Sequence, residues 1–418
     1  MDGIIMEYGL IGETLSHSFS KELHEQYLNT KYELVSLKKE ELKDFFLKKN
    51  FKGINVTIPY KKEVIQYLDY IDPLVKEINA CNCIINENGV LKGYNTDYFG
   101  FKFLLEENEI EVKDKKVAIL GSGGTFDTIN KVLKDLGAKE IYCISRTKKE
   151  SNYTYEELYT LDANILINAT PVGMYPNNYE CLVDLDKLKL EAVIDVIFNP
   201  LRTKLILEAK KRKIKAIGGL EMLIAQGVKA SELFLNKKYS YEEIRSHYFD
   251  VNVDKFNIVL IGMPMSGKTT LGKLLAEAFN KEFVDIDKEI VKRENKSINE
   301  IFELHGEEYF RKIEANLYEE YAKKNGLIIS TGGGIVKNIE SINRLKENGI
   351  IIFVDRNIDK MVFNNKRPLS KSKEDIEKLY LERHSLYLKN SDKRITNNGS
   401  KKRAVINIVE AFYEYIGN

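Results

Sequence analysis

The chain has 418 residues, with 64 lysines and arginines against 63 aspartates and glutamates, for a formal net charge of +1. This length exceeds the roughly 250–300 residues at which one hydrophobic core stops growing, so we expect two or three domains. The balanced charge argues against a nucleic-acid or membrane surface, and no apolar run approaches the roughly 20 residues that span a bilayer. The absence of a signal-peptide pattern and of paired CxxC spacing favours a cytoplasmic protein with reduced cysteines and no zinc site.

The first predicted strand covers residues 6–10 and leads through LSHSFS into a helical pattern. Serines where a strand gives way to a helix suit either a polar ligand or an N-cap. The strand-like segment INVTIPY, residues 54–60, runs into Lys61, which is either a solvated side chain or a partly buried catalytic amine. The Asn-Thr-Asp sequence that ends at Asp97 is turn chemistry by default, so a Lys61–Asp97 pair is a hypothesis.

Residues 116–120 form an apolar strand that leads to GSGGTF, a helical stretch to residue 136 and a second strand over 140–144. This order indicates a βαβ unit with a dinucleotide-type turn, although Phe126 occupies the third glycine position of GxGxxG. The second strand ends in Ser145, Arg146 and Thr147 where an NAD site would have an acidic residue. Cations and hydroxyls suit a 2′-phosphate, so the turn favours NADP, with a solvated basic turn as the alternative.

Further strands are predicted over residues 165–169 and 192–196, and GGLEMLIAQG opens a long helix. The sequence GMPMSGKTT then follows an apolar run at 258–261 and precedes a helical pattern over 271–279. Strand, glycine-rich loop and helix in this order predict a P-loop, whose backbone N–H groups face phosphate oxygens. There Lys268 would reach the β- and γ-phosphates and the Thr269 hydroxyl would bind Mg²⁺, so this part is predicted to bind a nucleoside triphosphate.

Residues from about 8 to 249 carry HSFS, NVTIPYK, ACNC, NTD, GSGG, SRT, NATPVGM, NP and GLEMLIAQ in that order, and this set resembles shikimate dehydrogenases. The resemblance implies reversible, NADPH-dependent reduction of 3-dehydroshikimate, with Lys61 and Asp97 as the catalytic couple. It implies substrate contacts at Ser18, Ser20, Thr57, Asn82, Asp97 and Gln226. It implies NADP contacts at Gly121, Ser122, Gly123, Gly124, Ser145, Arg146, Thr147, Lys149, Thr170, Gly219 and Met222.

Five positions depart from the pattern of that family, namely Lys21, Cys83, Asp127, Glu150 and Phe198. Phe198 replaces a tyrosine and removes a hydroxyl near the expected substrate, which puts substrate affinity in question. Asp127 and Glu150 place negative charge where cations are usual near the cofactor, which weakens the preference for NADP.

From residue 257 onward the chain resembles shikimate kinases, through the P-loop, FVDIDKEI, IFELHGEEYFRKIE, STGGG, KRPL and ERHSLY. The resemblance implies ATP contacts at Gly262, Met265, Ser266, Gly267, Lys268, Thr269, Thr270 and Arg367, and a Mg²⁺ ion near Thr269 and Asp285. It implies that Asp287 accepts a hydrogen bond from the attacking hydroxyl and acts as the base. The shikimate contacts would come from Asp287, Arg311, Gly333, Gly334 and Arg383.

We therefore predict an α/β chain with an α/β substrate domain over 1–105, completed by a helix over 219–249, and a Rossmann NADP domain over 106–218. A polar linker at 250–255 would precede a P-loop kinase domain with a parallel sheet over 256–418. The predicted function is reduction of 3-dehydroshikimate to shikimate followed by phosphorylation of the 3-hydroxyl, in aromatic amino-acid biosynthesis. A quinate/shikimate dehydrogenase of relaxed specificity fused to the kinase, or an inactive N-terminal module that regulates it, are the alternatives. The expected partners are small-molecule substrates, and homo-oligomerisation is left open.

Overall fold

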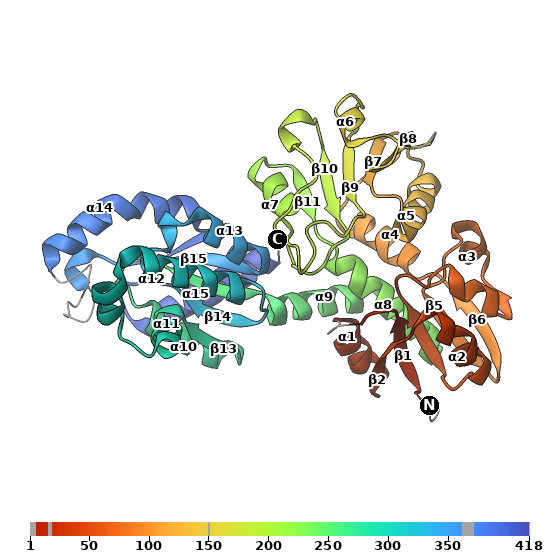
Figure 1. Ribbon diagram of the computed structural model, residues 1–418, viewed down its shortest axis with the longest axis horizontal. Helices are drawn as coiled ribbons and strands as arrows, with labels where there is room; N and C mark the ends of the chain where they lie inside the picture. The colour runs from red at the N-terminus through yellow and green to blue at the C-terminus, as the bar shows by residue number, and fades with distance from the viewer. Residues whose placement is uncertain (1–5, 16–18, 149–150, 362–371, 418) are drawn as a thin grey trace. The chain divides into compact units, whose positions relative to one another are not determined.

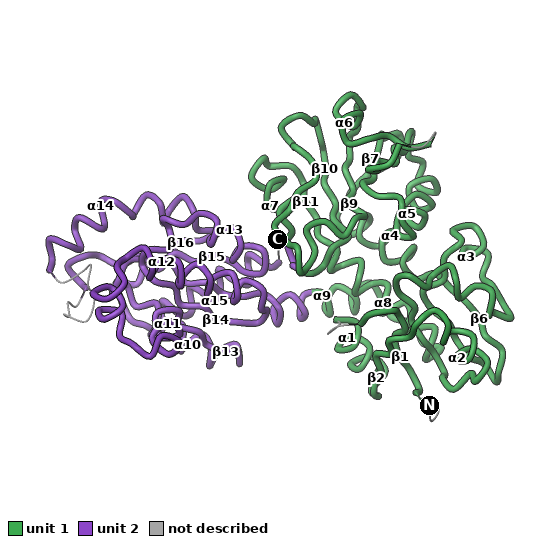
Figure 2. Tube along the Cα trace, viewed as in Figure 1, with its two compact units in different colours: residues 1–199, 203–248 green, residues 200–202, 249–418 purple. Residues whose placement is uncertain are grey.

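The computed structural model describes residues 6–15, 19–148, 151–361 and 372–417. The chain divides into two compact units, one of residues 1–199 and 203–248 and the other of residues 200–202 and 249–418 (Figures 1 and 2). Within the described ranges, no helix has the length and apolar content needed to cross a membrane. The mixed α/β fold class predicted from the sequence is confirmed.

The N-terminal lobe of the first unit is built on a six-stranded sheet with the order β2-β1-β3-β5-β6-β4. Strands β2, β1 and β3 are parallel, whereas β5 runs antiparallel to both β3 and β6. The strands are β1 (Tyr8–Gly12), β2 (Tyr32–Ser36), β3 (Gly53–Val56), β4 (Tyr70–Ile71), β5 (Cys83–Glu87) and β6 (Val90–Tyr94). The main helices of the lobe are α1 (Phe19–Leu28), α2 (Leu42–Lys48) and α3 (Pro73–Ile78).

The second lobe of this unit is a five-stranded parallel sheet with the order β11-β10-β9-β7-β8. Its strands are β7 (Lys116–Leu120), β8 (Glu140–Ile144), β9 (Ile165–Asn168), β10 (Ala192–Asp195) and β11 (Lys215–Ile217), and its helices are α5 (Gly124–Asp135), α6 (Tyr155–Leu158) and α7 (Lys204–Lys211). The strands β8 and β9, which follow β7 in the chain, lie on opposite sides of β7 in the sheet. Open α/β sheets bind ligands at such a point, beside the carboxyl ends of the strands. The strands predicted over 116–120 and 140–144 are confirmed residue for residue.

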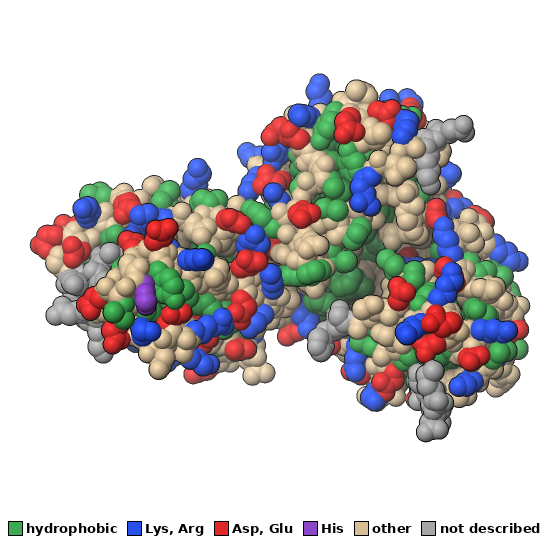
Figure 3. Space-filling view, viewed as in Figure 1, with side chains coloured by type: hydrophobic (Ala, Val, Ile, Leu, Met, Phe, Trp, Pro, Cys, Tyr) green, Lys and Arg blue, Asp and Glu red, His purple; other side chains and the backbone are tan. Residues whose placement is uncertain are grey.

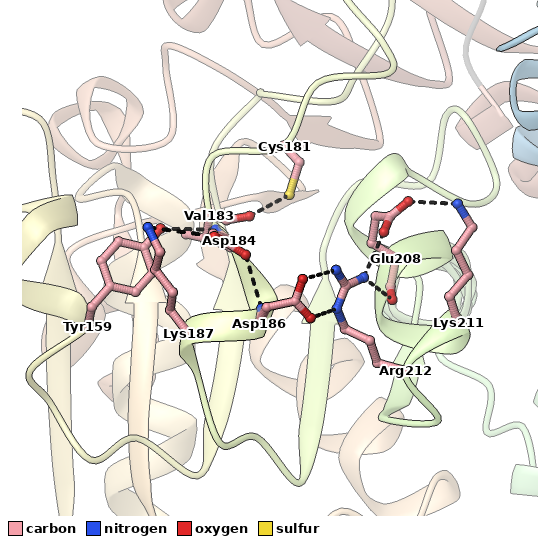
Figure 4. Close-up of polar contacts among 9 residues, drawn as sticks. All are labelled: Tyr159, Cys181, Val183, Asp184, Asp186, Lys187, Glu208, Lys211 and Arg212. Atoms are coloured by element: carbon pink, nitrogen blue, oxygen red, sulfur yellow. Dashed lines mark hydrogen bonds and ion pairs between the residues drawn. The ribbon is translucent and has the colours of Figure 1, made fainter.

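A network of ion pairs holds the segment between β9 and β10 against α7 (Figure 4). The Arg212 guanidinium donates to both carboxylate oxygens of Asp186 at 2.7 Å and to Glu208 Oε2 at 2.7 Å. The neighbouring backbone N–H of Asp184 donates to the Tyr159 hydroxyl at 2.9 Å. This bidentate geometry is specific to arginine and fixes the course of a segment that has no strand or α-helix of its own.

Two helices connect the lobes of the first unit, α4 (Asp97–Glu107) and α8 (Leu220–Leu235). They pack closely at Gly100, where an added Cβ atom would lie 2.6 Å from the Met222 carbonyl oxygen. In the space-filling view, the face of this unit turned to the viewer is hollowed between the lobes, and hydrophobic side chains lie in the hollow (Figure 3).

The single helix expected over 219–249 is instead two helices, and the segment 250–255 is helical rather than a polar linker. Helix α8 ends because Asn236 adopts a left-handed conformation, and α9 (Tyr241–Lys255) begins where the Glu243 N–H donates to the Ser240 hydroxyl at 3.2 Å. The segment 250–255 contains neither glycine nor proline, and Asn252 and the following Phe256 are buried. Nothing in it breaks the helix, so α9 continues to Lys255.

The second unit contains a five-stranded parallel sheet with the order β13-β14-β12-β15-β16, so β12 is the central strand. Its strands are β12 (Asn257–Ile261), β13 (Glu282–Asp285), β14 (Leu327–Ser330), β15 (Gly349–Asp355) and β16 (Lys393–Thr396). Its helices are α10 (Lys268–Phe279), α11 (Ile286–Glu294), α12 (Ile298–Ala322), α13 (Ile339–Asn348), α14 (Lys373–Asn390) and α15 (Lys401–Ile416). The predicted parallel sheet with a P-loop after its first strand is confirmed.

A substitution at Glu221, in the first turn of α8, tests how burial controls the stability of the first unit. Burial raises the pKa of Glu221 from 4.5 to about 7, while Asn108 Nδ2 donates to its carboxylate. Because the folded pKa exceeds the unfolded one, the free energy of unfolding falls by about 3 kcal/mol as the pH rises from below 4.5 to above 7. Glu221→Gln keeps an acceptor for Asn108 and removes the charge. We therefore expect a stabilisation that is larger at pH 8 than at pH 5, measured by thermal unfolding of the full chain; equal shifts at both pH values would contradict this account.

Candidate active sites

The first candidate site lies where the loop after β3 meets the start of α4. Lys61 Nζ donates to Asp97 Oδ2 at 2.6 Å, and the two side chains are only 19% and 14% exposed. The lysine backbone is fixed because its carbonyl accepts from the Cys81 N–H at 2.8 Å, and Asp97 is placed by being the first residue of α4. The structure thus brings together two residues 36 positions apart as a partly desolvated acid–base pair, which is the arrangement that proton transfer requires.

Three amide and hydroxyl side chains form a buried polar group next to this pair. Asn82 Nδ2 donates to Thr96 Oγ1 at 3.0 Å, and the Thr96 N–H donates to Asn82 Oδ1 at 2.7 Å. Thr96 Oγ1 donates in turn to Gln226 Oε1 at 3.3 Å, from α8. Asn82 and Gln226 were predicted as ligand residues, and Thr96, which the sequence reading left as part of a turn, links them. The following residue, Cys83, is buried in β5 with a free thiol.

Of the other predicted substrate residues, the structure describes Thr57, directly after β3, and Ser20, at the start of α1. Ser18 is outside the described residues, and Ser20 is the second residue of α1. Thr57 directly follows β3 and packs against Gly12, where an added Cβ atom would lie 2.8 Å from Thr57 Cγ2. Phe198 packs edge-on against Phe19, with ring centroids 5.7 Å apart, so this departure from a tyrosine is accommodated by aromatic packing that needs no hydroxyl.

A cavity of about 760 Å³ opens beside Lys61 and is lined by both lobes of the first unit. The N-terminal lobe contributes Ile58, Pro59, Lys61, Lys62 and Glu63. The other lobe contributes the glycine turn, the turn after β8 and the turn after β9, with lining residues Gly121, Ser122, Gly123, Gly124, Thr125, Ser145, Arg146, Thr147, Thr170 and Val172 among them. The structure therefore gathers most of the residues predicted to bind NADP around one cavity.

The geometry of the glycine turn fits a dinucleotide. Gly121 has a φ of +102°, which only glycine adopts without strain, and added Cβ atoms at Gly123 and Gly124 would project into open space. Gly123 precedes α5, so the first N–H groups of that helix face the cavity. Arg146 is exposed at the cavity wall, and the turn of residues 145–148 contains no acidic residue. A cation without a neighbouring carboxylate is what binding of a 2′-phosphate requires.

Two predicted cofactor residues do not line the cavity, and a third lies outside the described residues. Met222 is buried in the core that α4 and α8 form with the second lobe, and it is not among the residues that line the cavity. Gly219 is required by the backbone, because an added Cβ atom would lie 2.1 Å from the Val196 carbonyl oxygen. Lys149 lies outside the described residues.

The second candidate site is the P-loop between β12 and α10. Gly262 and Gly267 have φ values of +148° and +103°, so the turn depends on glycine at both positions. The buried Lys268 Nζ donates to the carbonyl oxygens of Gly262 and Met263 at 2.9 and 3.0 Å. A cavity of about 270 Å³ lies over this loop, lined by Met265, Gly267, Lys268, Thr269, Thr270, Asp287, Ser330, Thr331 and Arg356.

The residues predicted to hold Mg²⁺ lie in contact with each other. Thr269 Oγ1 donates to Asp285 Oδ2 at 2.7 Å, at the junction of β13 and α11. A hydroxyl and a carboxylate are ligands that Mg²⁺ prefers, usually together with waters and substrate phosphates. Within the described part of the chain, no group of three or more His, Cys, Asp or Glu residues could hold a metal ion by itself.

The predicted acid-binding residues surround the Thr331–Gly334 turn. Arg383 is 3% exposed, and its Nη1 donates to the Gly333 carbonyl oxygen at 3.1 Å. An added Cβ atom on Gly334 would lie 2.3 Å from Arg311 Nη1, so this arginine approaches the backbone closely. On the other side of the turn, a Cβ atom on Gly332 would lie 3.0 Å from Asp287 Oδ1. The structure thus gathers two arginines, the predicted base and the glycine run at one place, while Arg367 lies outside the described residues.

Sequence reasoning missed two residues at this second site. Glu314 is 3% exposed, and it accepts hydrogen bonds from Arg311 Nη1 at 2.8 Å and from the Tyr318 hydroxyl at 3.0 Å. Burial raises the pKa of Glu314 even though Arg311 opposes that shift. The Arg311–Glu314 spacing of three residues was an available signal, but on a helix it is also the spacing of an ordinary surface pair. Arg356 was missed because only its position directly after β15 distinguishes it.

Two family models match the chain. The shikimate kinase model matches residues 264–413, and the shikimate dehydrogenase substrate binding domain model matches residues 10–84.

Curated relatives and solved structures match the N-terminal part. The chain is 40% identical over 246 residues to the shikimate dehydrogenase (NADP(+)) of Clostridium beijerinckii, which covers 54% of this chain and 91% of that protein. It is similar to the crystal structure of a chorismate mutase/shikimate 5-dehydrogenase fusion protein from Clostridium acetobutylicum, with 34% identity, a TM-score of 0.56, and coverage of 58% of this chain and 96% of that one. Shikimate dehydrogenase 1 from Peptoclostridium difficile matches with 34% identity, a TM-score of 0.55 and coverage of 59% and 97%.

Proposed function

Because the chain belongs to the shikimate dehydrogenase family and continues into a shikimate kinase domain, we propose that it catalyses two consecutive reactions on one ring acid. In the first, 3-dehydroshikimate is reduced to shikimate with NADPH. In the second, ATP phosphorylates the 3-hydroxyl that the first reaction creates. The observation that carries the proposal is the Lys61–Asp97 pair beside a cavity with a dinucleotide-type turn, in the same chain as a P-loop.

In the dehydrogenase site, Lys61 is the proton donor and Asp97 positions it. NADPH supplies a hydride, and reduction of the ketone places negative charge on the carbonyl oxygen, which must be protonated within hydrogen-bond reach. Asn82, Thr57 and Gln226 bind the ring hydroxyls, and Ser18 and Ser20 bind the carboxylate. The hydrogen bonds among Asn82, Thr96 and Gln226 support this proposal, because they hold the amide groups in fixed orientations.

The preference for NADP over NAD is assigned to the turn after β8. Arg146 and Thr147 line the cavity and offer a cation and a hydroxyl to a 2′-phosphate. Ser145 has a structural part as well, because its hydroxyl donates to the Thr147 carbonyl oxygen at 2.7 Å and thereby shapes the turn.

In the kinase site, Asp287 orients and deprotonates the attacking hydroxyl, and Lys268 neutralises phosphate oxygens. Arg311 and Arg383 bind the carboxylate of shikimate, and Thr269 and Asp285 would hold a Mg²⁺ ion, which would neutralise phosphate charge of the nucleotide. This division of roles is what phosphoryl transfer demands, since catalysis there is mainly positioning and neutralisation of charge. The proximity of Asp287 to Gly332 and of Arg311 to Gly334 supports a substrate seated against this backbone.

We further propose that residues 1–105 form the substrate domain, residues 106–218 the NADP domain and residues 256–418 the kinase domain. The division of the strands among three separate sheets supports these boundaries. Because α9 extends through the segment 250–255, the kinase domain directly follows a helix.

A coupled reaction tests the whole proposal. The purified chain, incubated with 3-dehydroshikimate, NADPH, ATP and Mg²⁺, is expected to produce shikimate 3-phosphate, detected by mass spectrometry. Omitting ATP should stop the reaction at shikimate, and omitting NADPH should prevent both products. If the chain phosphorylates added shikimate but does not oxidise NADPH, the N-terminal half is a binding module and not a dehydrogenase.

Replacement of Lys61 separates the two activities. Lys61→Ala removes the proton donor, so the turnover number of the reduction should fall by about 100-fold to 10,000-fold. Kinase turnover with added shikimate should be unchanged, and it serves as the control for folding of the variant chain. If the turnover number of the reduction in Lys61→Ala stays within a few-fold of that of the unmutated chain, another group donates the proton.

Replacement of Gly334 tests the seat of the carboxylate. Gly334→Ala places a methyl group where Arg311 Nη1 now lies, so the guanidinium must move. We expect the KM for shikimate in the kinase reaction to rise about tenfold or more, with little change in the KM for ATP. Gly399→Ala is the matched control, because a Cβ atom at Gly399 meets no other atom within 4 Å. An unchanged KM for shikimate in Gly334→Ala would place the carboxylate elsewhere.

A further inference from the structure

The first turn of α5, the helix whose N-terminus lines the cofactor cavity, carries a carboxylate. Asp127 lies in the first turn of α5, three residues after Gly124, whose N–H is among those that face the cofactor cavity. A carboxylate in a first turn interacts favourably with the positive end of the helix dipole. The same carboxylate repels an anionic ligand that binds at that end, because both compete for one positive potential. An unpaired Asp127 would therefore oppose the diphosphate of a dinucleotide.

The structure pairs this carboxylate with a lysine from the other lobe of the first unit. Lys62 Nζ donates to Asp127 Oδ2 at 2.7 Å, and the two side chains are 49% and 32% exposed. Lys62 directly follows the proposed proton donor Lys61 and lines the cofactor cavity together with the glycine turn. The pair thus joins the loop that carries Lys61 to the helix whose N-terminus faces the cofactor.

Asp127 is the first of three charged residues spaced four apart along one side of α5. The second, Lys131, pairs with Glu77 of α3 at 2.6 Å and with Asp135 of α5 at 2.7 Å. The third, Asp135, accepts from the Tyr98 hydroxyl of α4 at 2.8 Å. Asp127 and Lys131 therefore face the N-terminal lobe and Asp135 faces α4, and among these pairs Lys62–Asp127 includes a residue that lines the cofactor cavity. The Lys131 pairs contribute to packing of the lobes and provide an internal comparison.

We propose that Lys62 is a positioning residue for the cofactor, which cancels the negative charge of Asp127 and so permits the diphosphate of NADPH to bind at the glycine turn. The lysine acts through Asp127 rather than by contact with the reacting atoms. The inference rests on the proposed dehydrogenase function and concerns only its cofactor site. It leads to an asymmetric expectation: loss of the lysine exposes a repulsive charge, whereas loss of the aspartate removes that charge.

The test is the Kd for NADPH, measured by calorimetry on the full chain without ring substrate. Lys62→Gln should raise the Kd by about threefold to tenfold, because one unpaired carboxylate then faces the diphosphate. Asp127→Asn should not raise it, and the double variant should return to within about twofold of Asp127→Asn. The increase in Lys62→Gln should shrink when the salt concentration rises from 50 to 500 mM, since salt screens exposed charges, at about a 10 Å Debye length in 0.1 M.

Lys131→Gln is the matched control, because it removes a lysine from the same side of α5 and should leave the Kd unchanged. An unchanged Kd in Lys62→Gln overturns the inference. A double variant as weak as Lys62→Gln also overturns it, because the lysine would then bind the cofactor directly. Equal weakening by Lys62→Gln and Asp127→Asn overturns it in favour of a mechanical contact between the lobes. These results leave the proposed function intact, whereas an unmutated chain that binds no NADPH overturns both.

Discussion

The close packing of α4 on α8 is the contact on which the dehydrogenase site depends. It is possible because Gly100 has no side chain, since a Cβ atom there would lie 2.6 Å from the Met222 carbonyl oxygen and 2.9 Å from Gln226 Cβ. Asp97 begins α4 one turn before this glycine, and Gln226 projects from α8 beside it. The ion-paired carboxylate and the amide are therefore placed by the same helix contact, and a larger residue at position 100 would displace both.

The elements of the fold were predictable wherever a local pattern decides them. The strand β7, the glycine turn and the strand β8 follow from an apolar run, a turn that needs glycine and a second apolar run, and each depends on few distant contacts. The same holds for the P-loop after β12. The helical character of residues 250–255 was missed because a short polar segment has no strong preference of its own. The burial of Asn252 and Phe256 decides its state, and burial is a property of the folded chain.

The sites were predictable in part, for a related reason. The types of residue at positions 61 and 97 suggested proton transfer, but their contact spans 36 positions and depends on how β3 and α4 meet. Glu314 shows the opposite limit. Its carboxylate is three residues from Arg311, which is also the spacing of an ordinary helix pair, whereas the structure buries it beside Asp287 and Gly332. Sequence spacing gives the neighbours of a side chain along one helix, and it does not give the elements that cover it.

In the proposed function both sites bind phosphate groups, and the lysines assigned to them are placed differently. Lys268 is 6% exposed and already bonded to two carbonyl oxygens of its own loop, so its amine is held in place before any ligand arrives. Lys62 comes from a separate lobe, is half exposed, and donates to the carboxylate of Asp127. A buried lysine bonded to its own loop keeps its position whenever that loop is folded. Lys62, which reaches Asp127 from the other lobe, keeps its position only while the two lobes are close together. The arrangement of the lobes that pairs Lys62 with Asp127 is therefore the same one that places Lys61 at the cavity. The proposed binding of the diphosphate and the placement of the proposed proton donor therefore depend on one arrangement of the first unit.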